Sequence, residues 1–419
     1  MHFPSTERLT AHLPNELKEA TADQVHAWAQ DSPGDYWEAV WEATGPVVGR
    51  TYAMKRLRNS WFIGAKLNLA AQRFPLTDPG ATALWFRNEL LEEPIPLEGS
   101  EVQSQVASMA AYLTSKGVDK GDRVGLYLPV IPEALYAIWA TWSLGAAVVF
   151  VPFRVAGAEA GAVFRDREIR VLITADGHER GGRAVPKMPE LATLIPMLDC
   201  CEQTVLVPYL DPSVRWDELP NTGLWIHTFR ADATELDIRE VGFNRTAWEE
   251  PLRKLELSQG GLLLTGLKHT KLDLALTAGE PLLAVHSHDG DTLLSLLGAW
   301  NAGAVPVVLD ADPGYPNHHP VWKLLADSGA TAADLSEEIL RRAATHAVQP
   351  SDHAGGQLQR LLVRGDLDPK TWEWAAAQLS GASTAAYGWS TDRQVATHWT
   401  TGTLEADHRI DPAPERTPV

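Results

Sequence analysis

The sequence predicts an α/β fold made of two packed lobes with largely parallel sheets. Short apolar runs alternate with helix-length segments from about residue 99, and a similar alternation starts again at about residue 260. The strand-like runs are apolar on both faces, which is typical of parallel sheets covered by helices. A chain of 419 residues is also long enough for two or three lobes, each with its own core.

The first alternation begins with a helix over residues 103–117, which Gly117 ends as a C-cap. Strands, each preceded by a helix or turn, are then predicted at 123–129, 146–152 and 171–177. The apolar run 134–152 is nearly long enough to span a membrane, but Gly145 divides it into a buried helix and a buried strand.

The second alternation predicts helices at 261–268 and 292–303, with strands at 281–286 and 304–310. We therefore expect four regions. These are an N-terminal cap over 1–98, a first α/β lobe over 99–240, a second lobe with a degenerate nucleotide site over 241–403 and a disordered tail over 404–419. The junction of the two lobes is the expected place for a pocket.

Composition narrows the class of partner. A formal charge of −18 argues against binding to nucleic acid and to anionic membrane surfaces, so small molecules or a protein are the expected partners. The two cysteines, Cys200 and Cys201, are adjacent and give no disulfide framework. Together with an N-terminus that lacks a signal-peptide pattern, they predict a cytoplasmic protein.

Several segments carry a family resemblance. They are W-F-I-G-A-K-L-N-L-A (61–70), G-D-R-V-G-L-Y-L-P-V-I-P-E-A (121–134), S-L-G-A (143–146), T-A-D-G-H-E-R-G-G-R (174–183), L-D-A-D-P-G-Y-P (309–316), V-R-G-D-L-D-P-K-T-W-E-W (363–374) and Y-G-W-S-T-D (387–392). In these segments the chain resembles the adenylate-forming acyl-CoA synthetases, and within them the acetoacetyl-CoA synthetase branch. The resemblance implies that a common fold covers most of residues 35–400. It also implies a family chemistry in which ATP activates an acid to an acyl-adenylate that is passed to coenzyme A.

The phosphate loop of that family has no counterpart here. It would lie in residues 244–261, an interval that has no glycine before Gly260 and that carries three glutamates. Backbone that wraps a phosphate needs residues that tolerate close approach, and carboxylates repel a triphosphate. Arg253 and Lys254 remain as anion contacts, or else they lie on an amphipathic surface helix. ATP and magnesium are therefore not expected as cofactors.

A degenerate nucleotide site is the second expectation from the resemblance. The family's aromatic-glycine-threonine-acid motif is matched with an ambiguous register, and the glycine-acid pair that lines the adenine site is present. The candidate pocket residues are Gly365, Asp366, Tyr387, Trp389, Thr391, Asp392 and Trp399. The two tryptophans could stack on a planar ligand or simply pack in the core. The chain ends soon after this motif, before the family's C-terminal domain and its catalytic lysine would begin, so ordinary ligation is not expected.

The segment A-V-H-S-H-D-G-D, residues 284–291, replaces an apolar wall of the family's acyl pocket with titratable groups. Its candidate catalytic residues are His286, His288, Asp289 and Asp291. Acid/base catalysis is one hypothesis, with a histidine as the proton carrier and an aspartate as its partner. In a second hypothesis an aspartate caps the following helix and the histidines are spectators.

A zinc site is a third hypothesis, which we do not favour. The spacing His286-x-His288 occurs in metal sites, but Gly290 stands where a metallohydrolase motif has an aspartate. A third ligand would have to come from His318, His319, Asp310 or Asp312.

The leading functional hypothesis is an ATP-independent enzyme that acts on an acyl or β-keto acid in specialised metabolism. The alternatives are a non-catalytic protein that binds an acyl ligand or a partner protein, and a residual ligase completed by a separate domain.

Overall fold

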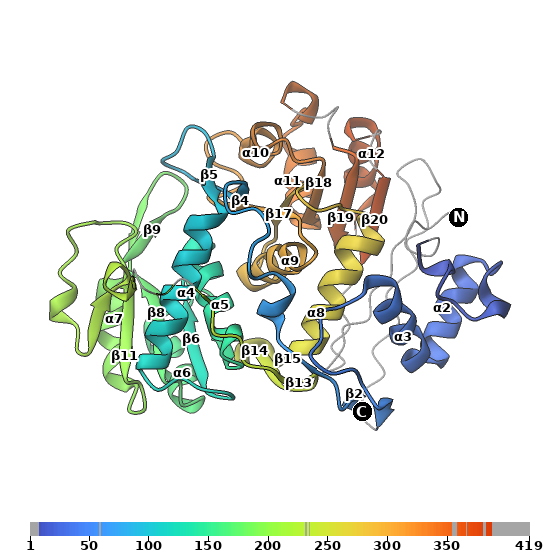
Figure 1. Cartoon of the computed structure of the whole chain (residues 1–419). Helices are drawn as coiled ribbons and strands as arrows, with labels where there is room; N and C mark the ends of the chain where they lie inside the picture. Colours follow the sequence, from blue (N-terminus) through green and yellow to red (C-terminus); the bar gives the residue numbers. More distant parts are fainter. Residues whose placement is uncertain are drawn as a thin grey trace.

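The computed structural model describes residues 8–57, 60–230, 233, 235–353, 358–365, 367–379 and 383–387, with no side chains for 22, 23, 26 and 383–387. Among these residues, a pair of seven-stranded sheets forms the two lobes, as the sequence predicts (Figure 1). No helix in the described ranges has the length and apolar character needed to cross a membrane.

The first sheet has the strand order β12-β11-β8-β6-β7-β14-β15 and is parallel except for its edge strand β15. Its strands are β6 (Arg123–Tyr127), β7 (Ala147–Phe150), β8 (Val171–Ala175), β11 (Gln203–Val207), β12 (Thr222–Leu224), β14 (Thr246–Glu250) and β15 (Leu255–Ser258). The helices of this lobe are α4 (Gly99–Ser115), α5 (Pro132–Ser143), α6 (Gly157–Asp166) and α7 (Met188–Leu194). The expected C-cap is present, because Gly117 has a φ of 78°.

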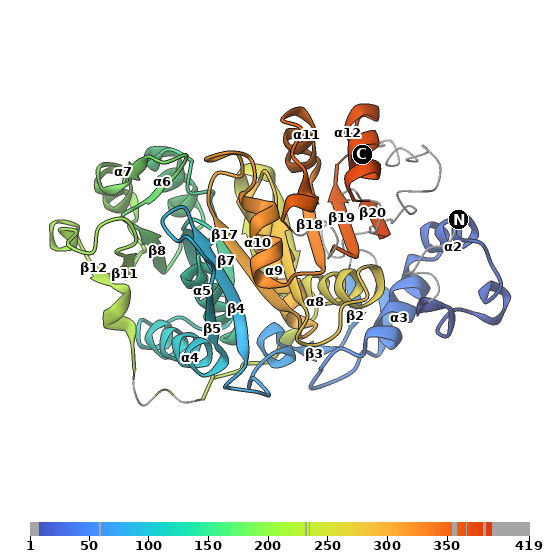
Figure 2. The same cartoon turned by 90° about the horizontal axis from the view of Figure 1, so that it is seen from above.

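The second sheet has the order β20-β19-β18-β16-β17-β4-β5, with only the edge strand β5 antiparallel. Its strands are β4 (Thr82–Asn88), β5 (Ile95–Glu98), β16 (Pro281–Val285), β17 (Val305–Asp310), β18 (Ala332–Ser336), β19 (Arg360–Arg364) and β20 (Ser383–Tyr387). Helices α10 (Pro320–Ser328), α11 (Glu337–Thr345) and α12 (Pro369–Gln378) lie on one side of it, and α8 (Gln259–Leu267) and α9 (Asp289–Asn301) lie on the other (Figure 2).

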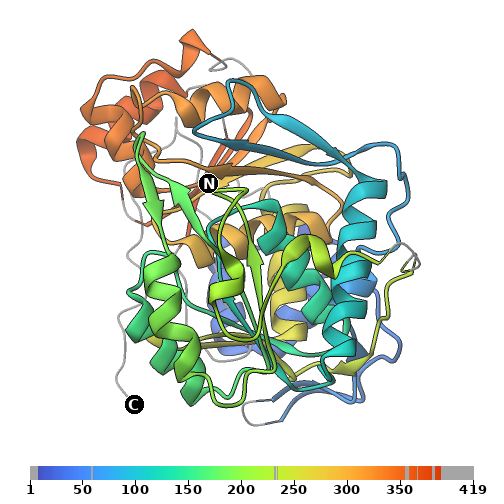
Figure 3. The same ribbon diagram turned by 90° about the vertical axis from the view of Figure 1, so that its left-hand side faces the viewer.

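The N-terminal segment packs on the outside of α8. It contains α2 (Ala22–Asp31), α3 (Pro33–Thr44) and the short strands β1 (Met54–Leu57), β2 (Ser60–Ile63) and β3 (Lys66–Leu67), of which β3 pairs with β13 (Val241–Gly242). A small hairpin, β9 (Gly177–Glu179) and β10 (Ala184–Pro186), projects from the first lobe (Figure 3).

The two lobes share one apolar interior. Trp139 of α5 and Trp300 of α9 meet edge to face with ring centroids 6.0 Å apart, and both are fully buried. At the rim, the carboxylate of Glu89 accepts hydrogen bonds from the backbone amides of Gly181, Gly182 and Asp312 at 2.7–2.8 Å. The first two amides belong to the β9–β10 turn and the third follows β17, so a single side chain joins the lobes.

The sheets cross the predicted region boundaries in two places. Strands β4 and β5, which the sequence assigns to the N-terminal cap, belong to the second sheet. Strands β14 and β15, which it assigns to the second lobe, belong to the first sheet. The sequence of a strand does not show which of two sheets the strand joins, because strand pairing is set by tertiary contacts. The tail 404–419 lies outside the described residues.

Candidate functional site

The histidine segment lies at the carboxyl end of β16, where a parallel sheet presents its functional loops. His288 is the N-cap residue of α9 and makes no side-chain capping bond. Asp289 and Asp291 lie in the first turn, where the helix dipole favours negative charge, but neither is the N-cap. The predicted capping aspartate is therefore wrong, because the helix begins one residue earlier than its first aspartate would require.

His286 is buried between the strand ends. Its Nε2 lies 3.4 Å from Oδ1 of Asp334 on the neighbouring strand β18, and its Nδ1 has no hydrogen-bond partner in the described part of the chain. Burial lowers the pKa of His286 and the nearby Arg364 lowers it further, while Asp334 opposes both. The imidazole is therefore held neutral.

Asp334 is the centre of this buried group. Its Oδ2 lies 3.0 Å from Nη2 of Arg364, and it accepts a short hydrogen bond from the hydroxyl of Ser295. Burial alone would raise the pKa of this carboxyl, but Arg364 and His286 outweigh burial and hold it far below its usual range. Asp334 is thus an anion that three side chains surround: Ser295 of α9, His286 just after β16 and Arg364 of β19.

His288 is paired with a residue from the other lobe. Its Nε2 lies 2.8 Å from Oε1 of Glu250, whose side chain is 1% exposed, and its own side chain is 18% exposed. On the other side of the ring, Nη1 of Arg253 lies 3.3 Å from Nδ1. The sequence predicts Asp289 or Asp291 as the histidine's partner, and in the structure that partner is Glu250.

The two aspartates of the segment contact arginines. Oδ1 of Asp291 accepts a hydrogen bond from Nη1 of Arg253 at 2.9 Å. Burial acts to raise the pKa of Asp291, but Arg364 and Arg253 lower it below its usual value. Asp289 lies 4.0 Å from Arg154, and its pKa is raised because burial outweighs the attraction of Arg154 and its other positive neighbours. The pKa values of these two neighbouring carboxyls are thus shifted in opposite directions, upward for Asp289 and downward for Asp291.

A β-hairpin spans the interval in which the resemblance predicts the family's phosphate loop. Strands β14 and β15 are joined by one short 3-10 turn, Pro251–Arg253, and by Lys254 in the left-handed conformation. The alternative in which Arg253 and Lys254 lie on a surface helix is therefore wrong. The paired strands are too close in sequence for a helix between them. The hairpin brings Glu250 and Arg253 to the histidine segment.

The nucleotide-like candidates are only partly placed. Gly365 follows β19 with a φ of 101°, a backbone conformation that residues with a side chain rarely adopt, so this position favours glycine. Tyr387 is the last residue of β20, paired in register with Arg364. The other members of this predicted set lie outside the described residues: Asp366, Trp389, Thr391, Asp392 and Trp399.

The described residues hold no cluster of three or more histidine, cysteine or acidic side chains that could bind a metal. His286 and His288 contact different carboxylates, Asp334 and Glu250, instead of sharing one point. Of the proposed third ligands, His318 stacks on His346 and His319 contacts His353. The donor set therefore does not fit zinc.

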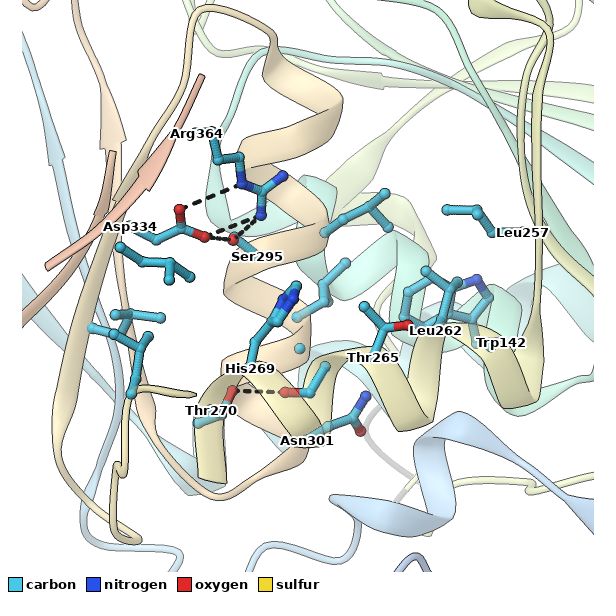
Figure 4. Close-up of a pocket in the computed structure, with 18 residues that line it drawn as sticks. Trp142, Leu257, Leu262, Thr265, His269, Thr270, Ser295, Asn301, Asp334 and Arg364 are labelled. Carbon is cyan, nitrogen blue, oxygen red and sulfur yellow. Dashed lines mark hydrogen bonds and ion pairs between the residues drawn. The ribbon is translucent and has the colours of Figure 1, made fainter. Parts of the chain in front are cut away.

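A narrow cavity lies beside this group, between helices α8 and α9 and the second sheet (Figure 4). Ser295, Asp334 and Arg364 form its charged end, and leucines from both helices form much of its wall. None of the four predicted catalytic residues lines the cavity. Arg364 connects the two features, because it lines the cavity and its Nη1 lies 4.0 Å from Asp291 of the histidine segment.

Sequence reasoning missed Glu250, Asp334 and the cavity residue His269. A signal existed for Asp334, since it is the one charge within the strand A-A-D-L-S, and a lone charge in a buried strand must be paired. Glu250 carried no such signal, because it comes from a distant segment that reaches the site only through the order of the first sheet.

Comparisons with known proteins agree with this architecture. Residues 70–238 match the model of the AMP-binding enzyme family. Acetoacetyl-CoA synthetase of Macaca fascicularis is 25% identical over 78% of this chain and 53% of its own length. Acetyl-coenzyme A synthetase of Bradyrhizobium sp. (strain ORS 278) is 25% identical over 85% of this chain and 58% of its own.

The solved acetoacetyl-CoA synthetase from Streptomyces lividans superposes with a TM-score of 0.80 at 26% identity, covering 92% of this chain and 63% of that one. The chain thus spans little more than half of the curated relatives it matches. The predicted resemblance and the predicted fold class are both confirmed.

Proposed function

Because this chain is a relative of the adenylate-forming acyl-CoA synthetases, we propose that it binds a small acyl or β-keto acid and acts on it without ATP. The observation that carries the proposal is the β14–β15 hairpin. It spans the interval in which the resemblance predicts the phosphate loop, and its Glu250 and Arg253 contact His288 and Asp291 of the histidine segment. The names of the relatives, acetoacetyl-CoA and acetyl-CoA synthetase, support the substrate class.

The hairpin supports ATP independence through its shape and its charge. A tight antiparallel turn has no run of backbone amides open to a phosphate, and the Glu250 carboxylate lies where it would repel one. Of the two cations in the turn, Arg253 already contacts the carboxylates of Glu250 and Asp291.

His288 is the proposed proton carrier, with Glu250 as its orienting partner. Nε2 of His288 faces the buried carboxylate of Glu250, which is the orienting arrangement used in general-base catalysis. The nitrogen left for the substrate proton is Nδ1, so in this proposal Arg253, whose Nη1 lies 3.3 Å from it, turns away when the ligand binds. His286, Asp289 and Asp291 form the surrounding group in this proposal. The reaction is removal and return of a proton on the carbon between the keto and carboxyl groups, which needs no other reactant.

Proton exchange tests this proposal. The purified chain is mixed with acetoacetate in D₂O, and loss of the carbon-bound proton signal is followed by NMR. We expect His288→Ala to slow the catalysed exchange by about 10²–10⁴-fold. Glu250→Gln should lower it less and shift its pH profile. The control is His227→Ala, an exposed histidine of the first lobe. Equal rates for His288→Ala and the unaltered chain would refute the catalytic role.

A second candidate is non-catalytic binding. The observation that favours it is that each of the four residues already has a side-chain partner of the chain itself, as expected for a structural network: a carboxylate for His286 and His288, and an arginine for Asp289 and Asp291. Binding of acetoacetate without any exchange above the solvent rate would support this candidate. Incorporation of labelled pyrophosphate into ATP with magnesium and the acid would instead support a residual ligase.

A further inference from the structure

We infer that the cavity between α8 and α9 is a hydration site, which binds two water molecules and links the two helices through them. The inference does not depend on the proposed function. It concerns two residues of the cavity wall, Thr265 and Asn301, that neither the family resemblance nor the histidine segment singles out.

The size of the cavity fits water. Its volume is about 30 Å³, counted as the space open to the centres of water molecules. A buried water needs about 10–15 Å³ on this measure, so the cavity has room for about two. A chain of several carbon atoms does not fit, and an acyl ligand therefore has to bind outside this cavity.

Two glycines fix the width of the cavity. A Cβ on Gly266 of α8 would lie 2.7 Å from the Cα of Gly298 of α9, so the helices touch backbone to backbone. Both glycines line the cavity, together with leucines of both helices. Because the two backbones are already in contact, the helices cannot move closer together to fill the space.

Two buried oxygens in the cavity wall have no hydrogen-bond partner within the described residues. They are Oγ1 of Thr265 on α8 and Oδ1 of Asn301 on α9, on residues that are 6% and 4% exposed. Buried polar groups are normally hydrogen-bonded, and an amide oxygen can only accept, so Oδ1 of Asn301 needs a donor. Water can donate to this oxygen and can also accept from the threonine hydroxyl.

The other threonines show that Thr265 is a special case. The hydroxyl of Thr270, which also lines the cavity, donates to the carbonyl of Gly266 at 2.9 Å. Thr141 of α5 makes the same bond within its helix, to the carbonyl of Ala137 at 2.8 Å. The hydroxyl of Thr265 lacks this bond among the described residues, although it too lies in a helix. Its partner is therefore expected inside the cavity.

The cavity also reaches the buried ions of the second sheet. Figure 4 shows Thr265 and Asn301 on one side of the pocket, and Ser295, Asp334 and Arg364 on another. Buried waters typically make about three hydrogen bonds each, which polar groups on both sides can supply. An apolar occupant of the same size would satisfy neither side, so the lining favours water.

Magnetic relaxation dispersion of water oxygen-17 tests the inference, because it counts the water molecules that a protein holds inside it in solution. The double variant Thr265→Val with Asn301→Leu nearly keeps both side-chain volumes and removes both polar groups. We expect this variant to lose the signal of about two long-lived waters relative to the unaltered chain. An unchanged count would overturn the inference.

Thr141→Val is the matched control, since the hydroxyl of this buried threonine already has its partner. Its water count should equal that of the unaltered chain, and a loss as large as that of the double variant would also overturn the inference. Thr265→Ser should retain both waters, which separates loss of the hydroxyl from a folding defect.

A crystal structure gives a second and independent reading. Water density is expected within hydrogen-bond distance of Oγ1 of Thr265 and Oδ1 of Asn301, and a dry cavity would contradict the hydration site. His288→Ala should leave the water count unchanged, so failure of the proposed catalysis and failure of this inference are distinguishable.

Discussion

Two buried carboxylates, one in each lobe, are satisfied in different ways. Asp176 follows β8 of the first sheet and accepts hydrogen bonds from the backbone amides of Tyr209, Leu210 and Asp211 at 2.7–2.8 Å. Asp334, on β18 of the second sheet, is held by side chains, chiefly the guanidinium of Arg364 and the imidazole of His286. Backbone amides are fixed and neutral, whereas side chains can titrate and move. The first carboxylate therefore fastens a loop, and the second can respond to a ligand.

The largest expected effect comes from removing Asp334. In Asp334→Ala the guanidinium of Arg364, which is 7% exposed, loses its buried counter-ion. We expect a loss of about 3–5 kcal/mol in the free energy of unfolding, measured with urea. Asp176→Ala should cost less, about 1–3 kcal/mol, because water can reach the partly buried amides it leaves. A larger loss in the free energy of unfolding for Asp176→Ala than for Asp334→Ala would contradict this comparison of the two carboxylates.

A double substitution tests whether Asp334 and Arg364 stabilise the fold as a pair. Asp334→Leu with Arg364→Leu removes both charges, and buried pairs replaced by apolar residues are often nearly neutral. We expect the double variant to lose less free energy of unfolding than the single variants Asp334→Leu and Arg364→Leu lose together. The expected difference is at least about 2 kcal/mol. Urea unfolding of the three variants gives this coupling energy. Strict additivity would show that the two residues do not act as a pair.

A third carboxylate, Asp310 at the end of β17, gives a test by pH. Burial raises its pKa to about 7. Because this pKa is higher in the folded chain than in the unfolded chain, where it is near 4, the protonated carboxyl favours the folded state. The contribution of Asp310 to stability is complete below about pH 4 and is lost as the pH rises to about 7. Asp334, with a lowered pKa, has the opposite sign and loses its contribution only as the pH falls below about 4.

Asp310→Asn should therefore remove a downward slope in stability between about pH 4 and pH 7, of at most about 1.4 kcal/mol per pH unit. Unfolding curves of both proteins across this range measure it. Parallel curves would show that Asp310 ionises alike in the folded and unfolded chain.

The smallest effect belongs to solvated pairs. Arg341 of α11 contacts Glu337 and Glu338 with its side chain 48% exposed. Arg341→Ala should change the free energy of unfolding by less than about 0.5 kcal/mol, as exposed pairs usually do. The measurement is the same urea titration, and a loss near that of Asp334→Ala would mean that burial does not explain the comparison.

Much of the fold follows from local patterns. The strands V-L-I-T-A and A-A-V-V-F are buried throughout, as their unbroken apolar runs indicate. The candidate site was less accessible to such reasoning. The pattern H-S-H-D-G-D identified the strand end, but the partners of its histidines come from β14 and β18. Sheet order decides those contacts, and no spacing in one segment encodes it.

The three amides bound by Glu89 also bear on how a ligand would be received. A carboxylate that ties the β9–β10 turn to the end of β17 opposes any opening between the lobes at that rim. The entropy of bringing the lobes together is then lost during folding and not at each binding event. Such a receptor should show the same shape with and without its ligand, and its affinity should depend on fit instead of closure.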